Sequence, residues 1–261
     1  MKTVVITGST RGIGFGMAKE FLRRGHQVVV SGRSDSSVAD ALAELGKEIK
    51  PEMLGGFACD MADYGQVDNL WKFSENLFGK IDIWINNAGI SHQSANFSDI
   101  PYEVFSTVIQ TNLIGVMNGV QIALQQMKKQ GFGFIYNMEG LGSDGRITPG
   151  LSIYGTSKRA LSYFTESVVK ENEESPVKIG FLSPGMVVTD LLLGDMDQRG
   201  EKWQRQKKIF NILADRVETV TPYLVEQILE NEKHGAKIAW LTTPKIIWRF
   251  LTAPIIKRDI L

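Results

Sequence analysis

Tyr154 and Lys158 are two residues of this chain whose types and spacing could move a proton. A free tyrosine titrates near pH ~10, which is too high for easy proton exchange at neutral pH. A lysine four residues later on a helix lies on the same face, so its ammonium charge is expected to favour the phenolate and lower the tyrosine pKa. The pair predicts general acid–base chemistry. Tyr-x-x-x-Lys is common by chance, so the other motifs must decide.

A glycine-rich segment near the start of the chain could bind a diphosphate. Thr7-Gly-Ser-Thr-Arg-Gly-Ile-Gly14 follows a strand-like run and opens a helical pattern. Glycines allow a tight turn and a close approach to phosphate, and the helix N-terminus supplies free N–H groups and a positive dipole end. The alternative is a glycine turn without a ligand. The position at a strand–helix junction favours dinucleotide binding, with contacts from Gly8, Ser9, Arg11, Gly12, Ile13 and Gly14.

The end of the second expected strand indicates which dinucleotide is bound. A site for NAD often has an acidic residue there, which holds the ribose hydroxyls. Here the strand ends Val30-Ser31-Gly32-Arg33-Ser34, with no acid at its tip. Arg33, together with Arg11 of the glycine loop, could bind a 2′-phosphate. The sequence therefore predicts NADPH (NADP) as cofactor, unless both arginines are only solvated surface residues.

Short β-branched runs alternate with longer helical patterns along the whole chain, which predicts parallel β-α-β crossovers. We expect an α/β fold: a doubly wound, Rossmann-type parallel sheet of about seven strands in a single domain, residues 1–261. Expected strands are Val4–Ile6, Gln27–Ser31, Leu54–Cys59, Ile81–Ile85, Gly133–Asn137, Val177–Leu182 and Lys237–Leu241. Expected helices are Gly12–Arg24, Asp35–Lys50, Tyr64–Phe78, Glu103–Gln130 with a break near Thr111, and Ser152–Asn172. Thr189–Lys207 is either a mobile lid or a solvated helical excursion.

The composition of the 261-residue chain is that of an ordinary globular protein. Its 29 basic and 29 acidic residues balance, which gives no reason to expect nucleic-acid binding. Cys59, the single cysteine, is expected to be a buried, inert thiol. The three histidines are scattered without metal-ligand spacing, so we expect no metal. With neither a secretory leader nor an apolar run of about 18 residues, we expect a soluble, cytoplasmic protein.

Several further motifs complete a recognisable series. They are Asp60, Asn86-Asn87-Ala88-Gly89, Asn112, Tyr154 with Lys158, Pro184-Gly185, and Thr189. Their order over residues 3 to about 190 resembles the short-chain dehydrogenase/reductase superfamily.

The resemblance implies a role for each of these positions. Asp60 would bind the adenine, and Asn87 would contact the ribose region of the cofactor. Thr189 would bind the nicotinamide carboxamide. Tyr154 would be the general acid of a carbonyl reduction, Lys158 would hold the nicotinamide ribose, and Asn112 would hold a water in a proton relay. Further cofactor contacts would come from Ala88, Gly89, Pro184 and Gly185.

One position departs from the superfamily pattern. A serine about 13 residues before the tyrosine usually binds the substrate carbonyl, but Gly140 or Leu141 occupies that place here. Ser143, 11 residues before Tyr154, could reach the carbonyl through a reshaped loop. Glu139 is the alternative if it is protonated, since a neutral carboxylic acid can donate a hydrogen bond.

The segment around Gly140, with two others, is similar to one particular branch of the superfamily. Residues 81–89, 133–160 and 181–193 are similar to the chlorophyll(ide) b reductase branch. That branch implies reduction of a formyl group on a tetrapyrrole, while another lipophilic aldehyde or ketone stays open because substrates vary within the superfamily. A redox-silent NADPH-binding scaffold or sensor is the competing interpretation, which the missing serine favours slightly.

The tail, residues 233–261, mixes basic and large apolar residues. Pro244 is expected to start a short helix and Pro254 to end it. This composition suits an interfacial membrane helix, but core and subunit packing use the same residues. We favour packing over membrane association, and the superfamily implies a homo-oligomer. His92 is expected to be an ordinary loop histidine rather than a residue of the substrate pocket.

Overall fold

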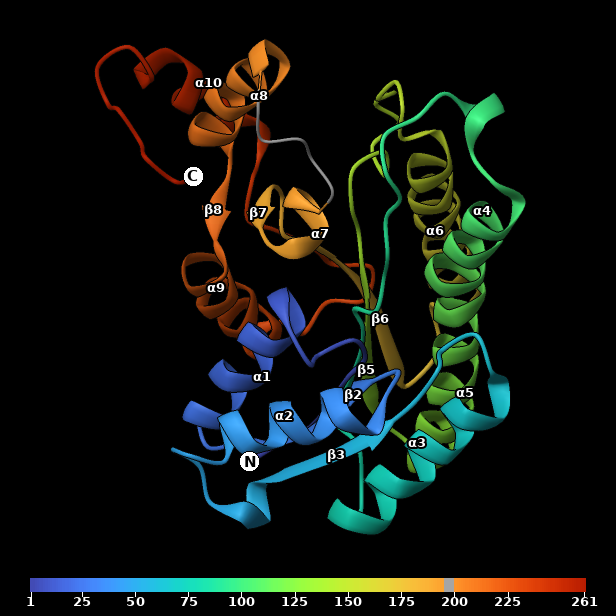
Figure 1. Ribbon diagram of the computed structural model, residues 1–261. Coiled ribbons are helices and arrows are strands. Elements are labelled where there is room, and N and C mark those ends of the chain that lie inside the picture. The colour runs from blue at the N-terminus through green and yellow to red at the C-terminus, as the bar shows by residue number, and fades with distance from the viewer. Residues whose placement is uncertain (195–199) are drawn as a thin grey trace.

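The computed structural model, which describes residues 1–194 and 200–261, is built around one parallel sheet (Figure 1). Its strand order is β3-β2-β1-β4-β5-β6-β9. The strands are β1 (Thr3–Ile6), β2 (Gln27–Gly32), β3 (Leu54–Ala58), β4 (Ile83–Asn86), β5 (Gly133–Met138), β6 (Val177–Ser183) and β9 (Lys237–Ala239). The order reverses direction between β1 and β4, and ligands of such sheets bind outside the carboxyl ends of the strands at this point.

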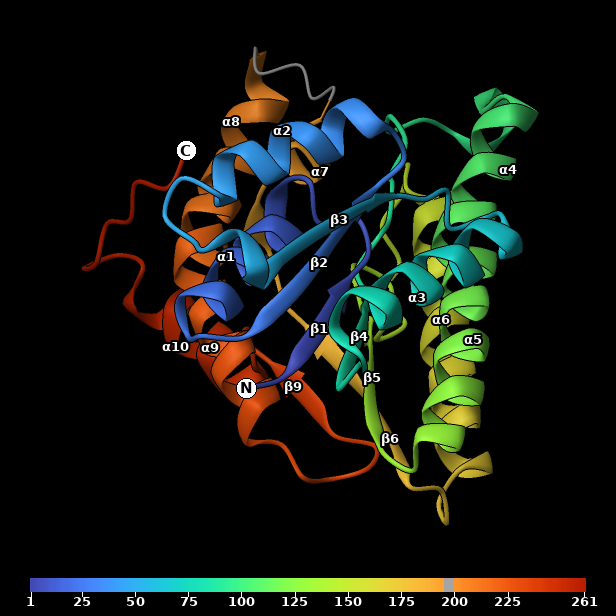
Figure 2. The same ribbon diagram turned by 90° about the horizontal axis from the view of Figure 1, so that it is seen from below.

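Helices cover both faces of the sheet (Figure 2). One face carries α1 (Gly12–Arg23), α2 (Asp35–Leu45) and α9 (Val217–Glu230). The other carries α3 (Tyr64–Phe78), α5 (Gly115–Gln130) and α6 (Ser152–Glu171). Successive strand residues point to opposite faces, so Val4 packs into the first layer and Val5 into the second. Apolar residues on both faces explain why the strands are continuous hydrophobic runs rather than alternating ones.

The remaining elements gather around the carboxyl ends of the strands. They are α4 (Tyr102–Ile109), β7 (Val187–Val188), α7 (Asp190–Leu193), α8 (Gly200–Leu213), β8 (Asp215–Arg216) and α10 (Thr243–Thr252). Strands β7 and β8 pair in parallel as a small second sheet. Of the helices within the described residues, none combines the length and the apolar character needed to cross a membrane.

The structure confirms the expected doubly wound sheet, including its last strand at Lys237. Two helices differ from the expectation. The helix from Asp35 ends at Leu45 rather than Lys50, because Gly46 closes it and a separate 3-10 turn follows at Pro51–Met53. The expected break near Thr111 is a π-helical turn, Gln110–Ile114, that joins α4 to α5 without ending the helix. Part of the expected lid, residues 195–199, lies outside the described residues.

Candidate active site

The loop after β1 depends on glycines that no other residue could replace. Gly8 and Gly12 have φ of 60° and 59°, the left-handed region. A Cβ at Gly8 would lie 2.6 Å from the Cα of Ala88, and one at Gly14 would lie 2.5 Å from Asn87 Nδ2. The loop therefore packs directly against the turn that follows β4. Arg11, which precedes α1, makes no side-chain cap among the described residues, so the first N–H groups of the helix stay available for an anion.

Two predicted cofactor contacts turn out to shape this loop. Ser9 is buried, donates to the Ile6 carbonyl (2.6 Å) and accepts from the Ser31 N–H (2.9 Å), which ties the loop to β2. Asn87 Nδ2 donates to the carbonyls of Thr7 (2.8 Å) and Gly8 (2.9 Å). These side chains hold the backbone in a cradle that a Cβ would fill, and such a cradle fits a dinucleotide diphosphate.

The turn after β6 closes the cradle from the other side. Thr189 lies against the glycine loop, with its Cγ2 3.5 Å from where a Cβ of Gly12 would stand. Gly185 has a φ of 72° and would place a Cβ 2.4 Å from Leu241 Cβ. Asp60, after β3, accepts from the Ala62 N–H (3.0 Å). Thr189 is thus the predicted nicotinamide contact that the structure brings to the glycine loop.

The two arginines predicted to select NADPH are both exposed. Arg33 follows the end of β2. Arg11 pairs with Asp190 of α7 at 3.3 Å, and both side chains are 78% exposed. The partner of Arg11 was not foreseen, and an exposed pair of this kind contributes little to stability. Joint binding of a 2′-phosphate by the two arginines stays a prediction.

The side chains of Tyr154 and Lys158 lie against Gly140, two residues after the end of β5. A Cβ added there would lie 2.5 Å from Tyr154 Oη and 3.2 Å from Lys158 Cε. Lys158 Nζ donates to the Met138 carbonyl (3.0 Å). Both side chains are buried on the first two turns of α6. The structure therefore places the proposed proton donor, its lysine and the β5 terminus at one point.

Burial dominates the titration of this pair. It raises the pKa of Tyr154 to about 12, because the phenolate loses its hydration. It lowers the pKa of Lys158 to about 8, against the nearby negative charge of Glu139, which raises it. The sequence predicted a tyrosine pKa lowered by Lys158. In this structure the shift has the opposite direction, and its cause is the desolvation of the phenol.

Asn112 lies in the π-helical turn and is fully buried. Its Oδ1 accepts from the Ile90 N–H (2.8 Å), while its Nδ2 donates to the Ile90 carbonyl (2.8 Å) and to Ser157 Oγ (3.1 Å). Gly89 lies between Asn112 and Lys158, since a Cβ there would be 3.4 Å from Asn112 Oδ1 and 3.6 Å from Lys158 Nζ. Asn112 clamps the loop after β4 to α6, and its role in a proton relay stays a prediction.

Ser143 is hydrogen-bonded within the loop after β5. Its buried Oγ accepts from the Gly140 N–H (3.1 Å) and donates to the Lys158 carbonyl (3.3 Å). These bonds tie the loop after β5 to α6. Gly140, rather than Leu141, occupies the place against the tyrosine oxygen. The prediction that Ser143 orients the substrate gains no support from this geometry.

Glu139 is paired with a lysine of the chain, whereas the sequence suggested that it could donate to the substrate carbonyl. Its buried carboxylate accepts from Lys237 Nζ of β9 at 2.8 Å and from Ser162 Oγ at 3.4 Å. A carboxylate in an ion pair is an acceptor, so the alternative of a protonated Glu139 donating to the substrate is not supported. Sequence reasoning missed Lys237 because 98 residues separate it from Glu139.

A buried chain of hydrogen bonds between polar side chains was also not predicted from the sequence. Trp84 Nε1 donates to Asn86 Oδ1 (2.8 Å), Asn86 Nδ2 donates to Asn137 Oδ1 (2.8 Å), and Asn137 Nδ2 donates to Thr165 Oγ1 (2.9 Å). The chain joins β4, β5 and α6 below the site. Asparagines that end two neighbouring parallel strands were the available signal, because the sheet places Asn86 directly beside Asn137.

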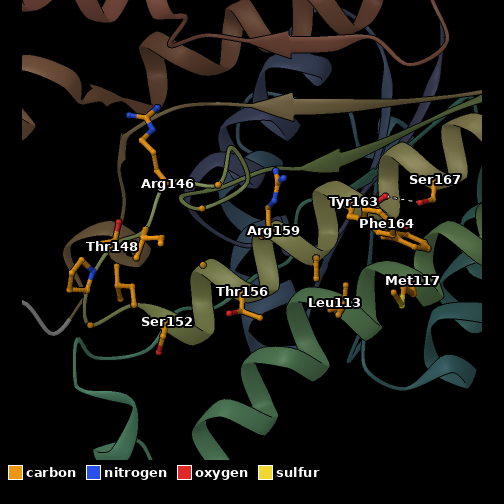
Figure 3. Close-up of a pocket in the computed structure, with 18 residues that line it drawn as sticks. Leu113, Met117, Arg146, Thr148, Ser152, Thr156, Arg159, Tyr163, Phe164 and Ser167 are labelled. Atoms are coloured by element: carbon orange, nitrogen blue, oxygen red, sulfur yellow. Dashed lines mark hydrogen bonds between the residues drawn. The ribbon is translucent and has the colours of Figure 1, made fainter.

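The large cavity of Figure 3 lies elsewhere. Its volume is about 960 Å³, and it is lined by the outer side of α6, by α5 and by the loop before α6. Tyr163 and Phe164 line it, whereas Tyr154 and Lys158 do not. This cavity is a surface groove beside the candidate site rather than the place where the tyrosine oxygen would meet a substrate.

A doubly wound sheet with a glycine cradle at its switch point is typical of a dinucleotide-binding protein, and a buried phenol beside a lysine at the next strand end is a group that an oxidoreductase could use as a proton donor. The chain belongs to the short-chain dehydrogenase family, whose model matches residues 2–199. Members of this class are NAD(P)-dependent oxidoreductases.

Two rice proteins are among its most similar relatives. The probable chlorophyll(ide) b reductase NYC1, chloroplastic, of Oryza sativa subsp. japonica is 36% identical over 97% of this chain and 52% of its own length. The chlorophyll(ide) b reductase NOL, chloroplastic, of the same plant is 40% identical over 86% of this chain and 66% of its own length. The chain thus spans about half of the first relative and just under two thirds of the second.

Solved structures share the fold. An alcohol dehydrogenase from the archaeon Thermococcus sibiricus complexed with 5-hydroxy-NADP superposes with a TM-score of 0.77 at 21% identity, over 93% of this chain and 97% of that one. A short-chain type dehydrogenase/reductase from Mycobacterium marinum gives a TM-score of 0.78 at 25% identity, over 91% and 93%.

Proposed function

We propose that this protein is an NADPH-dependent carbonyl reductase. The observation that carries the proposal is the convergence of Tyr154 Oη and the Lys158 side chain on Gly140, beside the glycine cradle. The glycine loop, Gly8 to Gly14, would hold the nicotinamide cofactor, whose chemistry would be the supply of a hydride for the carbonyl carbon. Tyr154 donates its proton to the carbonyl oxygen, so that C=O becomes CH–OH. Lys158, held by the Met138 carbonyl, carries the positive charge next to that oxygen.

The proposed substrate is the formyl group of a chlorophyll b-like tetrapyrrole, which would become hydroxymethyl. Support comes from the similarity to the two rice chlorophyll(ide) b reductases. Gly140 is compatible with this assignment, because at this position the backbone rather than a side chain lies against the tyrosine oxygen. Another lipophilic aldehyde or ketone is the runner-up.

NADPH is the proposed cofactor in preference to NADH. The support is the exposed Arg33 at the tip of β2, in the place where an acid would hold the ribose hydroxyls of NADH. A guanidinium there would form charge-assisted hydrogen bonds with a 2′-phosphate, which are stronger than its bonds to a neutral hydroxyl.

The deciding experiment follows NADPH oxidation against a panel of aldehydes and ketones that includes chlorophyllide b. We expect turnover of chlorophyllide b to its hydroxymethyl product, identified by mass, and a higher kcat/KM with NADPH than with NADH. NADPH binding without turnover of any carbonyl would favour the competing function, a redox-silent scaffold or sensor, which the glycine in place of the usual serine also suits.

We further propose a homo-oligomer that uses the outer face of α5 and α6. The groove of Figure 3 runs along these helices, and Tyr163, which lines it, is 73% exposed. A groove on a long, open helix face with an exposed aromatic side chain is a feature that subunit interfaces often have. Light scattering of the purified protein, compared with a Tyr163→Glu variant, would show a multimer that the variant loses.

A further inference from the structure

Helix α10 has its apolar side turned outward. Its exposed large side chains and those of the residues after it form what we call the tail surface: Ile247, Trp248, Phe250, Leu251, Ile255 and Ile256. At about 100° per residue, the four members within the helix occupy one continuous arc of about 160°. A helix of a soluble protein normally directs this arc to the core. Here Trp248 is 63% exposed and Leu251 is 70% exposed.

The polar side of α10 is what attaches the helix to the body. Arg249 pairs with the buried Asp215 of β8 at 2.8 Å and donates to the Leu213 carbonyl at 2.8 Å. Arg258, after the helix, pairs with the same carboxylate and donates to the Ala214 carbonyl at 2.8 Å. These contacts fix the orientation of α10, so the outward direction of its apolar arc is built in. Core packing, which the sequence favoured, does not account for the tail surface.

The charge around the tail surface is positive. Residues 243–261 contain four bases and one acid in a chain whose formal net charge is zero. Because Arg249 and Arg258 are paired with Asp215, the bases not bound to that acid are Lys245 and Lys257. Lys257 is exposed beside Ile255 and Ile256. Helix α8, which packs against α10, adds the exposed Lys208. An apolar arc with a tryptophan and flanking lysines matches the interfacial region of a bilayer with anionic headgroups.

We propose that the tail surface docks this protein on an anionic lipid surface. A second copy of the chain fits the surface less well. A symmetric dimer brings the same patch onto itself, so its bases would outnumber the acid available to pair with them, the exposed Asp259. Lipid phosphates supply the opposite charge, and acyl chains accept the apolar arc.

The position of the tail surface adds a geometric reason. Figure 1 shows α10 at the same end of the molecule as α8 and the loop between β5 and α6. That loop contains Gly140 and leads to Tyr154. A protein resting on a membrane through α10 therefore turns this end of the molecule toward the lipid surface. The docking itself rests on the tail surface alone, and it stands or falls independently of the proposed reaction.

The test is co-flotation of the full chain with vesicles. Vesicles of phosphatidylcholine with phosphatidylglycerol are expected to carry the protein at low salt, and pure phosphatidylcholine vesicles much less. Trp248→Ser combined with Leu251→Gln should abolish flotation. Lys208→Glu combined with Lys257→Glu should weaken partitioning roughly tenfold or more, since each base near an anionic surface contributes about 1 kcal/mol.

A matched control removes an exposed aromatic residue elsewhere. Tyr64→Ser on α3, where the tyrosine is 44% exposed, should float like the original protein. NADPH binding serves as the folding check, because all substituted residues lie outside the glycine loop and the catalytic pair. Three results would overturn the proposal: no flotation on anionic vesicles, equal flotation of the Trp248/Leu251 variant, or a dimer in solution that this variant dissociates.

Discussion

The loop after β1 and the loop after β5 each bring a glycine against a neighbouring group, but they are stabilised differently. The first is held by neutral hydrogen bonds from Ser9 and Asn87 to backbone atoms. The second encloses ionisable side chains, with Lys158 and Glu139 both buried. Neutral contacts within a loop keep their strength across pH, whereas buried charges titrate. The hydrogen bonds that hold the glycine loop should therefore be insensitive to pH, whereas the charge on Lys158 should not be.

The largest effect is expected from the phenol itself. Tyr154→Phe removes the proton donor but keeps the ring, so turnover should fall by roughly 100- to 10,000-fold while the cofactor site survives. Steady-state kcat would check the loss of turnover, and NADPH fluorescence titration would check that the cofactor still binds. A variant with near-normal kcat would remove Tyr154 from the mechanism.

Gly140→Ala should have the next largest effect. Its new methyl carbon would lie 2.5 Å from Tyr154 Oη, so the tyrosine or the loop must move, and kcat should fall roughly tenfold or more. Gly155→Ala is the matched control, at the residue that follows Tyr154 in α6. Its methyl group would meet nothing within 4 Å among the described residues. If the two alanines behave alike in kcat and in thermal unfolding, the close approach at Gly140 is not important.

Arg33→Ala tests the cofactor side of the comparison. Loss of a charge-assisted contact to the 2′-phosphate should raise KM for NADPH by about tenfold and leave KM for NADH unchanged. Lys19→Ala, an exposed base on α1, is a suitable control. Equal changes for both cofactors would mean that Arg33 does not read the phosphate.

The smallest predicted effect is a shift in pH dependence. Lys158, with a pKa lowered to about 8, loses its charge as pH rises above that value, so NADPH binding should weaken there. Burial of the charged ammonium lowers the free energy of unfolding, and this loss is complete below pH 8. The loss disappears as the pH rises from 8 toward 10.5, the ordinary pKa of lysine, at which the unfolded chain also releases the proton.

Variants of Glu139 and its partner test the direction in which the pKa of Lys158 shifts. The negative charge of Glu139 raises the pKa of Lys158, so Glu139→Gln should move the break in NADPH binding to lower pH. Lys237→Gln leaves Glu139 without its ion-pair partner and should move the break upward. Titrations of NADPH binding from pH 6 to 10, roughly the range around the two values, would compare the three proteins. Shifts in the same direction would exclude Glu139 as the residue that sets this pKa.

The sequence was informative wherever function is encoded by neighbouring residues. The glycine loop, the Tyr154–Lys158 spacing and the alternation of strands and helices are local patterns, and the structure brings them together as expected. Burial of Cys59 was also predicted and is confirmed. The contacts made across the sheet could not be read in this way. Glu139 meets Lys237 only because β5, β6 and β9 are adjacent, and Ser143 is taken up by backbone groups that no spacing rule reveals.

Asp215 connects the C-terminal residues mechanically to the end of the cradle that contains Thr189. This carboxylate belongs to β8, which pairs with β7, and the strand β7 leads directly into Thr189. Proteolytic loss of the last residues would strip both arginines from a buried acid, a change that typically costs about 3–5 kcal/mol. A cut far from the catalytic tyrosine would then be felt where the dinucleotide sits, which makes tail integrity a simple quality check on any purified preparation.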